Sequence, residues 1–261
     1  MSSCLSGGFL LQAQTAEPKI WGKGVESSAL LQERPLFGGA LGIDSGLAKS
    51  LSVQATRRTV GHNQFVYFQD DPAEHIYFVQ SGHVRLSYLM EDGSAILLDI
   101  LPPGASFGEV SIFEDGPHCD MATAIGDTVI GALPLRTCRA LADRHPELNT
   151  ALARLVSRRH RAYVEMTRSL SLRSLPARLA KGLLRLADTL GTVSLHEGRK
   201  VPSIGPIVTQ TDLGLMARGA RGNINRILKT WRESGWIGGG DRQILILNRA
   251  KLESLAIHED N

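Results

Sequence analysis

Four polar side chains in the segment 221–226 could recognise the bases of DNA. They are Arg221, Asn223, Asn225 and Arg226. An arginine can donate two hydrogen bonds to guanine O6 and N7, and an asparagine can form two with adenine N6 and N7. On a helix, these residues would avoid the apolar stripe and form the exposed face. The segment therefore predicts base contacts in a major groove, with a solvated polar surface as the alternative.

A helix that begins at Thr209 must position this face. The Thr209 side chain can cap the helix, Asp212 can bond back three residues later, and Val208 can pack against Leu213. Arg218-Gly219 then supplies a turn, because glycine accepts turn conformations.

A second helix is predicted from Ala220 to about Ser234, with an apolar face that includes Ile224, Leu228 and Trp231. Two helices joined by a short turn, with Gly214 where they would approach closely, predict a helix-turn-helix. The candidate DNA contacts are Thr209, Gln210, Arg218, Ala220, Arg221, Gly222, Asn223, Asn225 and Arg226.

The sequence after this motif predicts a wing. Trp236-Ile237 and the segment 243–247 flank a Gly-rich turn, which is typical of a β-hairpin. Asn248 can cap a last helix that extends through Leu255.

The segment 60–134 has short β-rich runs separated by turn residues, which predicts a jelly-roll-like sheet domain. The expected strands are 65–68, 75–79, 83–88, 95–101, 121–125 and 128–133. Short helices are expected before it, between residues 28 and 58.

Between Pro146 and Leu172 no residue breaks a helix. Leu148, Leu152 and Leu155 begin an apolar stripe that Ala162 and Met166 continue. The stripe could pack on the helix's own domain. We favour the seam of a dimer, because Arg159 interrupts the stripe and so long a helix usually connects units.

Ser174 and Pro176 are typical of the start of another helix, which makes 172–173 a hinge. The predicted parts are a poorly ordered extension (1–28), a sheet domain (29–145), a dimerisation helix (146–172) and a DNA-binding domain (173–261).

Composition supports this division. The net charge of +3 is small, but arginines concentrate in the second half and acidic residues in the first, which suggests a polyanion-facing C-terminal domain.

Three widely spaced cysteines form no CxxC motif. The N-terminus lacks the basic start of an export signal, and no stretch has the roughly 18 apolar residues of a membrane span. We expect a cytoplasmic protein without membrane contact.

From about residue 30 to 255 the chain resembles the Crp/Fnr family of bacterial regulators. The matching motifs include 76–79 with 81–84, Leu101-Pro102-Pro103-Gly104, Phe107-Gly108-Glu109 and the gapless winged-helix segment 208–237. The resemblance implies an α+β protein with a β-roll sensor of the cyclic-nucleotide-binding type, a long dimerisation helix and a winged helix-turn-helix. It also implies a homodimer that binds an inverted repeat in double-stranded DNA and can contact RNA polymerase.

The resemblance places a candidate effector pocket at Gly108, Glu109, Val110, His118, Cys119 and Asp120. In nucleotide-binding members an Arg-Ser pair follows, and its arginine neutralises the cyclic phosphate. Here Cys119 and Asp120 stand at those places. An aspartate repels a buried phosphate, so binding of cAMP is disfavoured, although His118 could substitute weakly for the arginine. The effector, if there is one, is not identified.

Other chemistries have less support in the sequence. Cys4 alone cannot supply the cysteine cluster of the family's iron–sulfur branch. No His-x-His motif occurs, so a cupin-like metal enzyme is disfavoured. We expect a regulator that is not an enzyme and whose β-roll senses an effector or serves only as a scaffold.

The DNA-reading segment departs from the family at two positions. Gly222 replaces the family's usual glutamate after Arg221. Arg218 replaces a usual left-handed glycine, and this replacement implies a shifted or strained turn.

Overall fold

A computed structural model describes residues 41–240 and 243–257 of the 261-residue chain. The expected N-terminal extension, 1–28, lies outside the described residues. Within the described ranges, no helix combines the length and the apolar character that a bilayer crossing requires.

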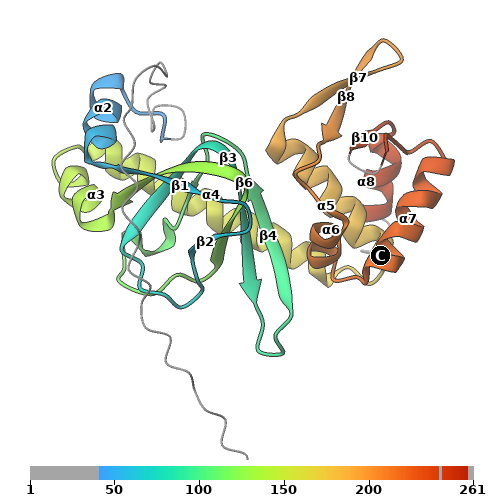
Figure 1. The fold of residues 1–261 in the computed structure, drawn as a ribbon, viewed down its shortest axis with the longest axis horizontal. Helices are drawn as coiled ribbons and strands as arrows, with labels where there is room; N and C mark the ends of the chain where they lie inside the picture. Colours follow the sequence, from blue (N-terminus) through green and yellow to red (C-terminus); the bar gives the residue numbers. More distant parts are fainter. Residues whose placement is uncertain (1–40, 241–242, 258–261) are drawn as a thin grey trace, which may run out of the picture. The chain divides into compact units, whose positions relative to one another are not determined.

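The first part of the described chain is an antiparallel sheet domain (Figure 1). Its strands follow the order β1-β6-β3-β4, while β2 pairs with β6 and β5 pairs with β3. The bounds are β1 Thr56–Val60, β2 Phe65–Tyr67, β3 His75–Leu89, β4 Ala95–Leu101, β5 Ser106–Phe107 and β6 Met121–Pro134. Most buried apolar side chains of these strands belong to two hydrophobic clusters, one that contains Phe78 and another that contains Phe107 and Ile130. The expected jelly-roll-like sheet is present.

Two expected pairs of strands are single long strands. The segments 75–79 and 83–88 both belong to β3, and 121–125 and 128–133 both belong to β6. The predicted turn at Ser81-Gly82 is instead an irregularity in the pairing of β3 with β6. Gly82 has φ +77°, and a Cβ there would lie 2.5 Å from the Thr128 hydroxyl oxygen. Glycine bends the strand at this point without ending it.

Short helices surround the sheet: α2 (Ser45–Gln54), the 3-10 helix η1 (Val110–Ile112) and α3 (Leu135–Ala142). The long helix α4 spans Pro146–Ser171, close to the expected bounds. Its residues Leu148, Leu152 and Leu155 are buried in the core that also contains Ile76 and Phe78 of β3. The apolar stripe therefore covers the helix's own domain, and our expectation that it forms a free dimer seam was wrong for these residues.

The C-terminal part contains α5 (Leu175–Leu190), α6 (Gln210–Ala217), α7 (Arg221–Glu233) and α8 (Arg249–Ile257). A four-stranded sheet runs in the order β7-β8-β10-β9, with bounds β7 Val193–His196, β8 Arg199–Ile204, β9 Ile237–Gly238 and β10 Ile244–Ile246. The helix start at Ser174 is confirmed, since its hydroxyl accepts from the Ala177 amide. Asn248 also caps α8 as predicted, by accepting from the Lys251 amide at 3.1 Å. The hairpin β7–β8 was not predicted.

Candidate DNA interface and ligand site

The start of α6 has the capping box that the sequence predicts. The Asp212 amide donates to the Thr209 hydroxyl at 3.1 Å, and the Thr209 amide donates to Asp212 Oδ2 at 2.8 Å. Asp212 is 1% exposed, and its Oδ1 pairs with Arg85 Nε of β3 at 2.7 Å. Gln210 follows as the first residue of α6. The capping box fixes where the first helix of the motif begins.

The turn between α6 and α7 keeps Arg218 in a left-handed conformation, with φ 50° and ψ 55°. We expected either a shifted turn or a strained one, and the structure confirms the strained turn, which costs about 1 kcal/mol. The Gly219 amide donates to the Gly214 carbonyl at 3.0 Å, and a Cβ on Gly214 would lie 2.8 Å from the Gly219 carbonyl oxygen. The turn closes tightly because residue 214 has no side chain.

Helix α7 has a buried face and an exposed face. Ile224, Leu228 and Trp231 are at most 3% exposed. Most of the candidate contacts are exposed and lie in or near the first part of α7. The exposed ones are Thr209, Arg218, Ala220, Arg221, Gly222, Asn223 and Arg226, and the half-buried ones are Gln210 and Asn225. Arg221 Nε lies 3.4 Å from Gln210 Oε1. The structure therefore brings these residues together on one surface that is free to meet DNA.

The candidate effector pocket divides into buried and exposed members. Gly108 has φ +73°, and a Cβ there would meet Tyr77 and His118 at 3.1–3.2 Å. This backbone turns Glu109 inward, where it is 2% exposed, while the next residue, Val110, is 42% exposed. Glu109 is the member of this pair that can contribute to an interior site.

At the other end of the pocket, His118 and Asp120 are buried and Cys119 is exposed. The His118 ring stacks on Tyr67 with centroids 3.6 Å apart. Asp120 Oδ1 accepts from the Tyr67 hydroxyl at 2.7 Å, and its Oδ2 accepts from the Tyr163 hydroxyl at 2.5 Å. Both carboxylate oxygens of Asp120 thus have partners within the chain.

Sequence analysis missed the contribution of α4 to this site. Arg159 Nε donates to Glu109 Oε1 at 2.9 Å, and its Nη2 donates to the Ser106 carbonyl at 2.8 Å. Its Nη1 lies 3.7 Å from Asp99 Oδ2. We interpreted Arg159 as an interruption of a dimer seam, whereas it is 9% exposed and faces its own β-roll. A charge inside an apolar stripe was the signal for an interior partner.

The electrostatics of the site follow from burial. Burial raises the pKa of Glu109, although neighbouring Arg159 acts in the opposite direction. Burial and then the charge of Asp120 raise the pKa of both Tyr67 and Tyr163. Burial lowers the pKa of His118, which disfavours the imidazolium and makes this residue a weak substitute for a phosphate-binding arginine. Arg159 is the cation that faces Glu109.

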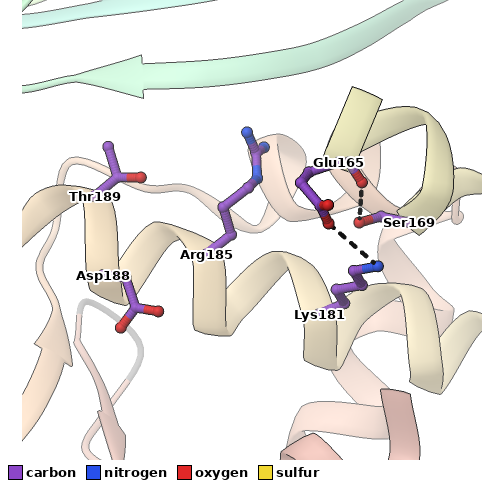
Figure 2. Close-up of a pocket in the computed structure, with 6 residues that line it drawn as sticks. All are labelled: Glu165, Ser169, Lys181, Arg185, Asp188 and Thr189. Atoms are coloured by element: carbon purple, nitrogen blue, oxygen red, sulfur yellow. Dashed lines mark hydrogen bonds and ion pairs between the residues drawn. The ribbon is translucent and has the colours of Figure 1, made fainter. Parts of the chain in front are cut away.

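A separate groove of about 420 Å³ lies between α4 and α5 (Figure 2). Lys181 Nζ reaches Glu165 at 3.7 Å, and Arg185 donates to the Leu98 carbonyl at 2.7 Å. Asp188 is bound by Arg249 through two hydrogen bonds of 2.7 and 2.8 Å. These charges already have partners, so the groove is not a stronger candidate than the two sites above. In the residues that the structure describes, no His, Cys, Asp and Glu cluster is arranged for a metal ion.

A winged helix-turn-helix with an exposed, arginine-bearing second helix, preceded by a β-roll and a long helix, defines a DNA-binding transcription regulator. Two family models agree: the Cyclic nucleotide-binding domain matches residues 57–145, and the Crp-like helix-turn-helix domain matches residues 177–255. The chain belongs to the Crp/Fnr family of transcription regulators.

Relatives cover nearly the whole described chain. The Cyclic AMP receptor protein of Thermus thermophilus is 30% identical over 224 residues, 85% of this chain and 96% of the relative. The CRP-like cAMP-activated global transcriptional regulator of Mycobacterium tuberculosis is 29% identical over 81% of this chain and 92% of its own length. The structure of FixK2 from Bradyrhizobium japonicum matches with a TM-score of 0.67 and 26% identity, over 77% of this chain and 96% of that one.

Proposed function

We propose that the protein is a homodimeric regulator that recognises an inverted-repeat operator through α7, in the cytoplasm and without enzymatic activity. The observation that carries this proposal is the division of α7 into a buried apolar face and an exposed face with Arg221, Asn223 and Arg226. Paired helices of this kind dock in successive major grooves, about 34 Å apart. A two-fold symmetric dimer then requires a symmetric operator.

The dimer seam that we propose lies on the side of α4 that its own domain leaves uncovered. Ala153, His160, Val164 and Thr167 are exposed. At about 100° per residue, these positions fall on one side of the helix, away from Leu148 and Leu155. Ala153, Val164 and Thr167 have small or apolar side chains, which suit close helix pairing.

A charge at the seam tests this assignment. We expect Val164→Glu to give monomers in analytical ultracentrifugation, because two carboxylates would meet across the two-fold axis. Val53→Glu is the matched control, since Val53 is 76% exposed on α2, outside the seam. A Val164→Glu protein that stays dimeric would place the interface elsewhere.

Selection of binding sites from random duplexes tests DNA recognition. We expect an inverted repeat whose half-sites are spaced by about one helical turn, and weaker binding at higher salt because arginines also contact phosphates. Recovery of an asymmetric site, or of no preferred sequence, would contradict the proposal.

The proposal also includes RNA polymerase as a partner, because a Crp-type regulator acts at promoters. Its contact surface is not assigned.

Activation by cAMP is the second candidate function, and the names of the relatives from T. thermophilus and M. tuberculosis favour it. Asp120 and Cys119, at the places of the phosphate-binding pair, argue against it.

A further inference from the structure

We propose that the chain's own side chains fill the nucleotide site of its β-roll, so that the regulator binds its operator without a cyclic nucleotide. This inference rests on the proposed operator binding and extends it to regulation. Three residues from outside the pocket motif carry it: Tyr67 of β2, and Arg159 and Tyr163 of α4.

The first observation is that most polar groups of the site already have partners within the chain; Glu109 Oε2, which is buried without a hydrogen bond, is the exception. Asp120 accepts from two tyrosine hydroxyls, at 2.7 and 2.5 Å. Arg159 donates to Glu109 and to the Ser106 carbonyl at 2.9 and 2.8 Å. A nucleotide would have to break these buried bonds before it formed its own, which opposes binding.

The second observation is the sign of the charge. The buried acidic residues Glu109, Asp99 and Asp120 surround the site, and Arg159 lies between the first two. A cyclic phosphate would add a further negative charge to this group. Arg159, the cation that the described residues place at this site, is already paired with Glu109, so the phosphate would be desolvated and repelled.

The third observation connects the site to the DNA-binding part. Asp99 of β4 lies 3.7 Å from Arg159 of α4 and 3.6 Å from Arg185 of α5. Arg185 also donates to the Leu98 carbonyl at 2.7 Å. The internal contacts therefore hold α4 and α5 against the same strand, which is the positioning that an effector would otherwise have to provide.

Calorimetric titration of the full-length protein with cAMP, cGMP and adenosine tests the inference directly. We expect no saturable binding of any of the three and no change in operator affinity when they are added. Adenosine has no phosphate, so it distinguishes a filled site from one that only repels anions. Saturable binding of any of these probes would overturn the proposal.

Two variants test the role of the network. We expect Asp120→Ala to lower operator affinity about tenfold at a temperature where the protein is folded, because both tyrosines lose their acceptor. Asp127→Ala is the control, since Asp127 is exposed on β6, the strand that begins directly after Asp120. Asp120→Asn removes the charge but keeps the bulk, so it should still not bind cAMP. Binding of cAMP by Asp120→Asn, or unchanged operator affinity of Asp120→Ala, would contradict the proposal.

Selection of binding sites with and without cAMP distinguishes a failure of the filled-site proposal from a failure of operator recognition. Specific duplexes recovered without nucleotide support both proposals. Specific duplexes recovered only with nucleotide would overturn the filled site and leave operator recognition intact. No specific duplex under either condition would overturn operator recognition, while the calorimetric result would still decide the state of the pocket.

Discussion

Arginines serve opposite purposes in the two sites of this protein. Arg226 is exposed on α7, whereas Arg159 is 9% exposed and bound to Glu109 and the Ser106 carbonyl. An exposed guanidinium keeps its five donors for an external partner, such as guanine or phosphate. A buried guanidinium already uses its donors in hydrogen bonds within the chain, and its removal leaves the charges of its partners without a counterion.

The two candidate sites of this chain therefore differ in exposure: the residues of one are accessible to an external partner, and those of the other are buried and bound to each other. The candidate DNA interface is assembled from residues close in sequence, at the start of α6, in the turn and in the first part of α7, whose apolar side packs into the core. The candidate ligand site is assembled from four elements, β2, β4, β5 and α4, together with Glu109 and with Asp120, which directly precedes β6. Changes in any of these elements can alter what the second site accepts.

The largest effect should come from the buried site. Arg159→Met should lower the free energy of unfolding by about 3–5 kcal/mol, because Glu109 keeps its buried charge without a counterion. Urea unfolding at fixed protein concentration measures it. Arg161→Met, at an exposed position of α4, should stay within about 0.5 kcal/mol of the wild type. Adding Glu109→Gln to Arg159→Met should recover part of the loss, and equal stability of the Arg159 and Arg161 variants would refute the comparison.

The exposed site should respond in affinity and not in stability. Arg226→Ala should cost about 1–3 kcal/mol of specific binding per half-site and relax the preference at one symmetric pair of bases. Lys229→Ala, one turn later and exposed, is the control. Arg221 lies nearer the helix start; if it contacts phosphate, its loss should weaken binding to all duplexes and flatten the salt dependence. An Arg226→Ala protein with its full specificity ratio would mean that another element enters the groove.

A smaller effect is expected at the turn, where stability and DNA affinity should change in opposite directions. Arg218→Gly should raise the free energy of unfolding by up to about 1 kcal/mol, because glycine adopts φ 50° without strain. It should also weaken binding to all duplexes, since one positive charge per subunit is lost. Arg218→Lys keeps both the charge and the strain and serves as control. Lower stability of the glycine variant would show that the arginine side chain stabilises the turn.

The smallest effect concerns pH. Burial lowers the pKa of His75, His83 and His118, so the unfolded chain takes up protons at a higher pH than the folded one. Stability should therefore fall as the pH decreases below the ordinary histidine value of about 6.5. Asp120 and Asp71 oppose the shift at His118, and His75 adds to it, but burial dominates. Melting temperatures at several pH values measure the slope.

A histidine variant isolates one contribution to that slope. His118→Asn should make the pH dependence shallower, because it removes one histidine whose pKa burial lowers. Parallel curves for wild type and His118→Asn would exclude His118 as a source. The raised pKa of Glu109 acts in the opposite direction, since protonation in the acid range favours the folded state there.

The DNA-binding helices could be predicted because their signals are local. Thr209 and Asp212 are three residues apart, and the caps at Ser174 and Asn248 act within one turn of helix. The hairpin β7–β8 escaped prediction although Glu197 and Gly198 both have positive φ, as a tight hairpin turn requires. Its first strand, Val193–His196, alternates apolar and polar residues, but it is only four residues long and its apolar side chains are the exposed ones.

The ligand site could not be completed from sequence because its contacts are distant along the chain. Tyr163 lies 43 residues from Asp120, and Arg159 lies 50 from Glu109. The apolar stripe of α4 is compatible with packing on its own domain or on a partner, since periodicity identifies a face but not what covers it. The motif at Glu109 indicated a candidate pocket, and the contacts of Arg159 and Tyr163 with its residues are visible only in the tertiary structure.

The tyrosine pair on Asp120 gives this protein an intrinsic optical probe. Of its four tyrosines, Tyr67, Tyr77 and Tyr163 have a pKa raised by burial. Phenolate formation changes near-ultraviolet absorbance, so an alkaline titration of the folded chain should show these three rings ionising late and together with unfolding. Earlier ionisation of Tyr67 and Tyr163 under otherwise native conditions would report that the interior of the β-roll has opened, without any label.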